Sequence, residues 1–86
     1  MKTFRELDEA TGQAKGAAFR AFKRLEPGLR EGQDFLLLWP GRDDTLIGEL
    51  RTQDRVYRNS VNIVLLDDAL AERLLKHLSG SLEPGQ

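Results

Sequence analysis

The chain has 86 residues, of which 40% are hydrophobic and 31% charged, and its formal net charge is −1. These are ordinary values for a globular protein, so we expect one folded domain whose size leaves little room for a pocket. The absence of cysteine excludes a disulfide framework, a thiolate nucleophile and a sulfur-ligated metal site.

The charge is unevenly distributed along the chain. Residues 1–30 carry seven basic and four acidic side chains, whereas residues 31–86 carry six basic and ten acidic ones. A basic N-terminal third suits a domain that docks one face on an anion, although mixed charge also keeps a surface soluble. No stretch has the apolar core of a signal peptide or the roughly 20 apolar residues of a membrane span. The default expectation is therefore a cytoplasmic protein with no membrane contact.

Two short helices are predicted in the first 25 residues. Thr3 and Glu6 have the spacing of a capping box, which starts a helix that Gly12 ends. A second helix should run from about Gln13 or Ala14 to residue 25, where the Glu-Pro-Gly sequence at 26–28 breaks it. Apolar residues recur along this second helix at helical spacing, namely Ala14, Ala18, Ala21, Phe22 and Leu25.

Two buried strands are predicted in the middle of the chain. The continuous apolar run at residues 35–39 lies between Gly32 and a Pro40-Gly41 turn, and residues 61–66 are β-branched and apolar. Their pairing stays open, because residues 40–60 suit either a right-handed parallel crossover or a lengthened antiparallel wing. Since two strands leave two edges, helices must cover the sheet or a second copy must pair with it, which makes a homodimer one expected arrangement.

Two further helices complete the domain. Asp43 or Asp44 should cap a helix that ends between residues 52 and 55, and Asp67 or Asp68 should cap a last helix that ends at residue 78. The predicted order is α-α-β-α-β-α, an α+β domain over residues 1–78 in which a helix-turn-helix-like hairpin packs with a small two-stranded sheet and two helices. The polar residues 79–86 are expected to be a disordered tail.

A motif joins the first two helices. Thr11-Gly12 ends the first helix, a polar and basic stretch opens the second, and Phe19-Arg20 follows one turn later. This segment resembles the helix-turn-helix of the MerR/excisionase-type winged regulators. Residues 29–35 resemble the start of that family's wing, and residues 62–71 resemble its exit strand and closing helix.

Three features depart from the family's pattern. Asp8 stands where the family usually buries a small apolar residue, and Gln13 stands where an apolar turn residue is expected. Residues 40–60 are also far longer than a usual wing tip. If the helix at about 14–24 reads a nucleic acid, Lys15, Arg20 and Lys23 should share one exposed face, and Asp8 and Gln13 should stay out of the core.

The resemblance implies a non-enzymatic DNA-binding protein, such as a transcriptional regulator or a phage-type accessory factor, with double-stranded DNA as partner. A helix N-terminus attracts phosphate through its free N–H groups, and small residues permit close backbone approach. Arg20 is the candidate for reading guanine, and Lys15 and Lys23 are candidates for holding phosphates. The expected contact residues are Ala14, Lys15, Gly16, Phe19, Arg20, Lys23 and Arg24.

An alternative function is a protein-interaction module, in which a strand edge or the Phe19/Phe22 surface engages a partner and the helical hairpin is only a scaffold. A second basic string, Arg51, Arg55 and Arg58, could reach an adjacent groove or phosphate if the wing is real, and it fits a solvated helix face equally well.

The remaining polar and aromatic residues predict structural roles. The paired aspartates are explained as helix caps rather than as a cation site, and Trp39 and Tyr57 should pack in the core or at its rim. His77, the single histidine, has neither a nucleophile nor an orienting acid nearby in the pattern. We therefore expect no enzyme activity, metal, cofactor or small-molecule substrate.

Overall fold

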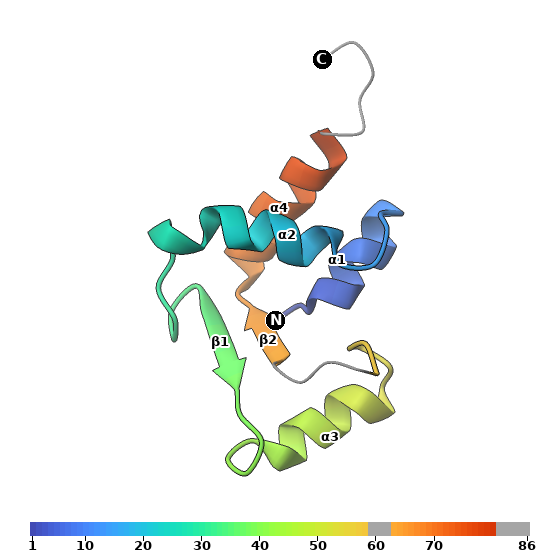
Figure 1. Cartoon of the computed structure of the whole chain (residues 1–86), viewed down its shortest axis with the longest axis vertical. Coiled ribbons are helices and arrows are strands. Elements are labelled where there is room, and N and C mark those ends of the chain that lie inside the picture. The colour runs from blue at the N-terminus through green and yellow to red at the C-terminus, as the bar shows by residue number, and fades with distance from the viewer. Residues whose placement is uncertain (59–62, 81–86) are drawn as a thin grey trace.

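The structure, a computed structural model, describes residues 1–58 and 63–80. The elements follow the predicted order α-α-β-α-β-α and form an α+β domain (Figure 1). They are α1 (Phe4–Thr11), α2 (Ala17–Leu25), a single 3-10 turn (Glu26–Gly28), β1 (Phe35–Leu38), α3 (Asp44–Thr52), β2 (Ile63–Leu66) and α4 (Asp68–Gly80).

The predicted ends of α1 are confirmed. The Thr3 hydroxyl accepts a hydrogen bond from the amide of Glu6 at 3.2 Å, and Oε1 of Glu6 accepts one from the amide of Thr3 at 2.9 Å. This is the capping box that the spacing predicts. Gly12 ends the helix in the left-handed conformation, with φ of 67°, which glycine adopts without a steric penalty.

The second helix begins later than predicted. α2 starts at Ala17 rather than at Gln13 or Ala14, because Gly16 has a left-handed φ of 94° that interrupts the helical backbone. The amide of Ala17 closes a turn on the carbonyl of Ala14 at 3.1 Å. Residues 13–16 therefore form a loop between the helices, and three of the expected contact residues lie in that loop instead of in α2.

The two strands pair antiparallel, which settles the alternative that the sequence left open. The register runs from Phe35 opposite Leu66 to Leu38 opposite Ile63. Trp39, the last residue of the first predicted strand, lies just beyond β1. Residues 61 and 62 of the second predicted strand lie outside the described residues.

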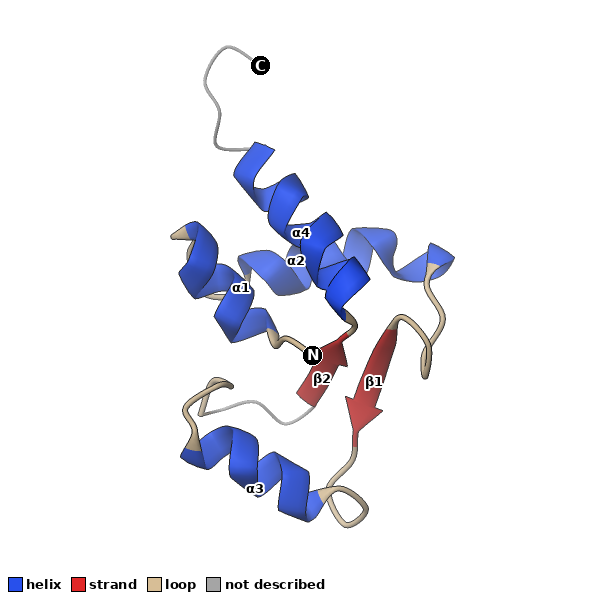
Figure 2. Cartoon of the chain, turned by 180° about the vertical axis from the view of Figure 1, so that it is seen from behind, coloured by secondary structure: helices blue, strands red, loops and turns tan. Residues whose placement is uncertain are grey.

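Helices cover the sheet from two sides. One set of strand residues, which includes Phe35 and Leu66, packs into a core with α1, α2 and α4. The alternating set, which includes Leu38 and Leu65, packs with Ile47 and Leu50 of α3. In Figure 2 the strands lie between the α1–α2–α4 group and α3. The described residues thus cover both faces of the sheet without a second copy.

Each edge of the sheet has some of its backbone groups occupied. Beyond β2, Lys2 and Leu66 exchange backbone hydrogen bonds of 3.0 and 2.8 Å. Beyond β1, the carbonyl of Phe35 accepts from the amide of Gly32 at 2.6 Å, and the carbonyl of Leu37 accepts from Nη2 of Arg42 at 2.8 Å. Strand addition by a partner would have to displace these bonds.

The aspartates before α3 and α4 play different roles. Asp67 accepts from the amide of Ala69 at 3.1 Å and so caps α4, as predicted. Asp43 occupies the cap position of α3 but makes no capping hydrogen bond; its carboxylate accepts instead from the amide of Trp39 at 2.8 Å. Asp44 accepts from Gly41 at 2.9 Å. This pair therefore shapes the turn after β1, because that turn presents free amides closer than the helix does.

The last helix is longer than predicted. α4 continues through Ser79 and Gly80, so these two residues belong to the helix rather than to the expected tail. Residues 81–86 of that tail lie outside the described residues.

Candidate nucleic-acid interface

One face of α2 is buried and the other is basic. Ala18, Ala21 and Phe22 are buried, where α2 packs against α1 and α4. The opposite face exposes Phe19, Arg20, Lys23 and Arg24, and no residue of α2 is acidic. Because Phe22 is only 2% exposed, the expected Phe19/Phe22 surface does not exist.

The loop before α2 adds to this face. Ala14 and Lys15 are exposed, and Gly16 is half-buried. The guanidinium of Arg20 folds back over Gly16, so that a Cβ at that glycine would lie 3.1 Å from Nη1 of Arg20. The Arg20 side chain thus lies against Gly16, the neighbour of Lys15 in the loop. Together the loop and helix residues form what we call the α2 basic face: Ala14, Lys15, Gly16, Phe19, Arg20, Lys23 and Arg24.

The cations of the α2 basic face differ in their partners. Nζ of Lys23 is 2.6 Å from Oε1 of Glu26, an exposed ion pair. Among residues 1–58 and 63–80, no carboxylate lies within ion-pair distance of Lys15, Arg20 or Arg24. Three positive charges of this face are therefore available to an external anion.

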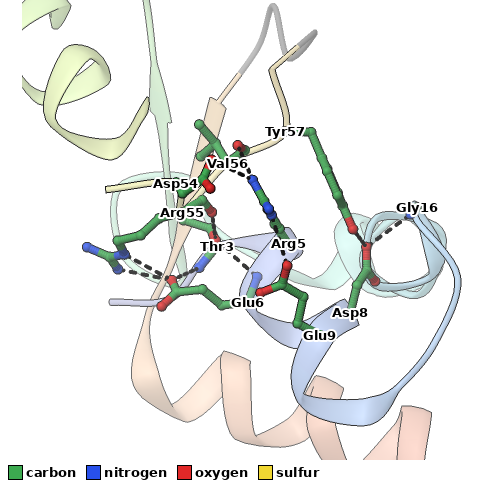
Figure 3. Close-up of polar contacts among 10 residues, drawn as sticks. All are labelled: Thr3, Arg5, Glu6, Asp8, Glu9, Gly16, Asp54, Arg55, Val56 and Tyr57. Atoms are coloured by element: carbon green, nitrogen blue, oxygen red, sulfur yellow. Dashed lines mark hydrogen bonds and ion pairs between the residues drawn. The ribbon is translucent and has the colours of Figure 1, made fainter. Parts of the chain in front are cut away.

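Asp8 fixes the start of α2. Its carboxylate accepts hydrogen bonds from the amide of Gly16 at 3.0 Å and from the hydroxyl of Tyr57 at 2.5 Å (Figure 3). It also accepts one from the amide of Ala18 at 2.7 Å. The expectation that Asp8 stays out of the core is wrong, because the residue is only 1% exposed. Its burial is possible because each oxygen has a hydrogen-bond donor.

The Asp8 carboxylate changes the expected role of the helix N-terminus. The amides of Gly16 and Ala18 would be the phosphate ligands of a free helix end, but both already donate to Asp8. The positive end of the helix dipole therefore has an anion of its own. The amides of Gly16 and Ala18 are therefore not available to phosphate, and the side-chain cations become the main candidates for phosphate contacts on this surface.

Gln13, the other residue expected outside the core, is half-buried. Its Nε2 donates to the carbonyl of Leu78 at 3.4 Å. The loop is thereby tied to α4.

The segment after α3 is bound to the start of α1 by charged side chains. Arg5 donates to Glu9 at 3.0 Å, to Asp54 at 3.1 Å and to the carbonyl of Val56 at 3.2 Å (Figure 3). On the other side, Nη2 of Arg55 is 3.0 Å from Oε1 of Glu6, and the Thr3 hydroxyl donates to the carbonyl of Arg55. Arg55 is thus part of an internal ion pair and does not belong to an external basic string, whereas Arg51 and Arg58 are exposed.

The pKa values of Glu6 and Tyr57 are displaced from their ordinary values. Burial raises the pKa of Glu6, but hydrogen bonds from Arg55 and from the Thr3 amide outweigh it, so that the pKa lies below its ordinary value. Burial, followed by the hydrogen bond to Asp8, raises the pKa of Tyr57 to about 12. The Tyr57 ring also carries the ammonium of Lys15, whose Nζ is 4.9 Å from the ring centroid.

Trp39 is the aromatic residue that sequence reasoning misplaced. It was expected to pack in the core or at its rim, and it is 49% exposed. The strand ends one residue earlier, and the Pro40-Gly41 turn that follows carries the indole out of the core. Tyr57, in contrast, is half-buried, as a residue at the rim should be.

In the part of the chain that the structure describes, no helix is long and apolar enough to span a bilayer. In the same residues, no three histidine or acidic side chains come together as metal ligands. No family model matches this chain, and no curated protein or solved structure is significantly similar to it.

Proposed function

We propose that the chain binds double-stranded DNA through the α2 basic face. The observation that carries the proposal is the set of cations Lys15, Arg20 and Arg24, which have no carboxylate partner among the described residues, on a helix with no acidic residue. A protein that places Lys and Arg on phosphates releases counterions from DNA, and this supplies most of its nonspecific affinity.

The side chains of the α2 basic face make different contacts with DNA in this proposal. Lys15 and Arg20 lie near the start of α2, where a winged regulator meets the floor of the major groove, and Arg20 can donate two parallel hydrogen bonds to a guanine. Arg24 lies one turn further along and contacts phosphate. Lys23 joins them when DNA displaces Glu26, which costs little because exposed ion pairs are weak.

The topology supports the same proposal. The antiparallel pairing of β1 and β2 suits a wing rather than a parallel crossover, and α3 occupies the place of the wing tip (Figure 1). These features agree with the resemblance of residues 6–22 to the MerR/excisionase-type helix-turn-helix. The carbonyls of Phe35 and Leu37, which already accept hydrogen bonds at the outer edge of β1, weigh against the alternative of a partner strand adding to β1.

The test is a fluorescence-anisotropy titration of a labelled duplex of about 20 base pairs over a series of salt concentrations. Three or four phosphate contacts predict that log K falls with log salt with a slope of about −3. Absence of binding at low salt, or binding with no dependence on salt, contradicts the proposed function.

A further inference from the structure

A shallow apolar hollow of about 220 Å³ lies between α2 and β1. Phe19 and Trp39 line it together with Leu37 and Val64, and the Lys23–Glu26 ion pair is also part of its lining. The hollow therefore extends from the end of β1 to the α2 basic face. Phe19 and Lys23 belong both to the lining of the hollow and to the α2 basic face.

Of the three aromatic residues that line this hollow, Phe22 is buried and the other two are exposed. Phe19 is 47% exposed and Trp39 is 49% exposed, and only two other large hydrophobic residues among those described are exposed to a similar degree. A contiguous patch of exposed aromatic surface with polar groups around it often marks a binding site. The aliphatic side chains of Leu37 and Val64 give a bound group an apolar surface to pack against.

The apolar lining of the hollow suits a flat, apolar-faced group, and the neighbouring cations of the α2 basic face suit an anion attached to that group. Aromatic side chains next to lysine and arginine are the surface on which unpaired bases stack, and any base satisfies it through its π face. Arg20 and Arg24, which have no carboxylate partner among the described residues, lie on the same helix as Phe19, where the backbone that carries such a base would pass.

We propose that the hollow binds one unpaired nucleobase, stacked on Trp39 and Phe19, of the same nucleic acid whose phosphates contact the α2 basic face. This inference rests on the proposed function. Bases of an intact duplex are stacked on each other and are not available, so the protein prefers a duplex that contains an unpaired base over one that is fully paired.

The experiment compares two labelled duplexes of equal length, one fully paired and one with a single unpaired adenine in the middle. We expect the bulged duplex to bind at least about fivefold more tightly, the lower end of what stacking of one base contributes. Trp39 is the single tryptophan of the chain, so its fluorescence reports on the hollow alone. It should be quenched by the bulged duplex and much less by the paired one.

Substitutions at Trp39 separate stacking from folding. Trp39→Ala should bring the two duplexes to equal affinity, while Trp39→Phe should keep most of the difference because it keeps a ring. Leu46→Ala is the matched control, because Leu46 is an exposed apolar residue of α3 outside the hollow. Circular dichroism confirms that each variant keeps its helices.

Three outcomes of these experiments would overturn the inference. Equal affinity of the wild-type protein for both duplexes, with salt-dependent binding intact, contradicts the base site and leaves the proposed function standing. A concentration-dependent dimer that Trp39→Ala abolishes, seen by sedimentation, assigns the hollow to a second copy instead. Absence of binding to either duplex removes the proposed function and the inference together.

Discussion

The hydroxyl of Tyr57 lies 2.5 Å from Oδ2 of Asp8, and this contact joins the segment after α3 to the start of α2. The same carboxylate holds the first amides of α2, and the Tyr57 ring lies beneath the ammonium of Lys15. The long insertion between the strands thus supports the loop that carries part of the α2 basic face.

Replacing Asp8 should destabilise the fold. Asp8→Ala leaves buried donors without an acceptor and should lower the free energy of unfolding by about 3 kcal/mol. Asp8→Asn keeps one acceptor oxygen and should cost about half as much. Urea denaturation measures both values. The control Glu72→Ala, at an exposed position of α4, should stay within about 0.5 kcal/mol of the wild type, and an equally small effect at Asp8 would contradict this role.

The raised pKa of Tyr57 predicts a loss of stability at high pH. Burial and the Asp8 hydrogen bond raise the pKa from 10.0 to about 12 in the folded state, so between these values the folded chain holds a proton that the unfolded chain has lost. The contribution of Tyr57 is complete below pH 10 and is lost as the pH rises through 12.

Tyrosinate absorbance measures this directly, because Tyr57 is the single tyrosine of the chain. The folded protein should titrate about two pH units higher than the same chain in denaturant. A shared midpoint in the two conditions would show that Tyr57 does not donate to Asp8 in solution.

Two glycines should respond to alanine in opposite directions. Gly12 has a left-handed φ of 67°, so Gly12→Ala should destabilise by about 1 kcal/mol. Gly48 lies inside α3, and a Cβ there meets no atom within 4 Å, so Gly48→Ala should stabilise by about 0.5–1 kcal/mol. Thermal unfolding ranks the variants, and a stabilising Gly12→Ala would exclude Gly12 as the end of α1.

Local signals were sufficient to predict most of the elements. The Thr3–Glu6 spacing and Gly12 mark the ends of α1 because their partners lie within the same few residues. The apolar runs that form β1 and β2 are likewise visible in the printed sequence. Their antiparallel pairing depends on how the insertion between them packs, which neither run encodes by itself.

The role of Asp8 could not be predicted from the sequence. Its partners lie eight, ten and 49 residues away, so no short motif contains them, and an acidic residue in α1 normally indicates an exposed position. The exposure of Trp39 was missed because an apolar run does not show which of its residues is the last in the strand. For the α2 basic face, the sequence predicted the exposed cations but not the loop that holds Lys15.

Removing one unpaired cation of the α2 basic face should weaken DNA binding more than removing a cation elsewhere. Arg20→Ala should lower affinity for a duplex about tenfold at low salt and reduce the salt slope by about 0.9. The matched control is Arg73→Ala, at an exposed position of α4. This helix lies behind α2 in Figure 1 and in front of it in Figure 2. Arg73→Ala changes the net charge by the same amount as Arg20→Ala. Equal losses of affinity in the two variants would therefore indicate a general electrostatic attraction to DNA rather than binding through the α2 basic face.

The measurement that tests the central claim most directly is a map of backbone amide chemical shifts in the ¹⁵N-labelled protein as a duplex is added at low salt. The proposed function predicts that the largest changes fall on residues 14–20 and on Lys23 and Arg24. Changes confined to α3 and α4, or no changes at all, would contradict it.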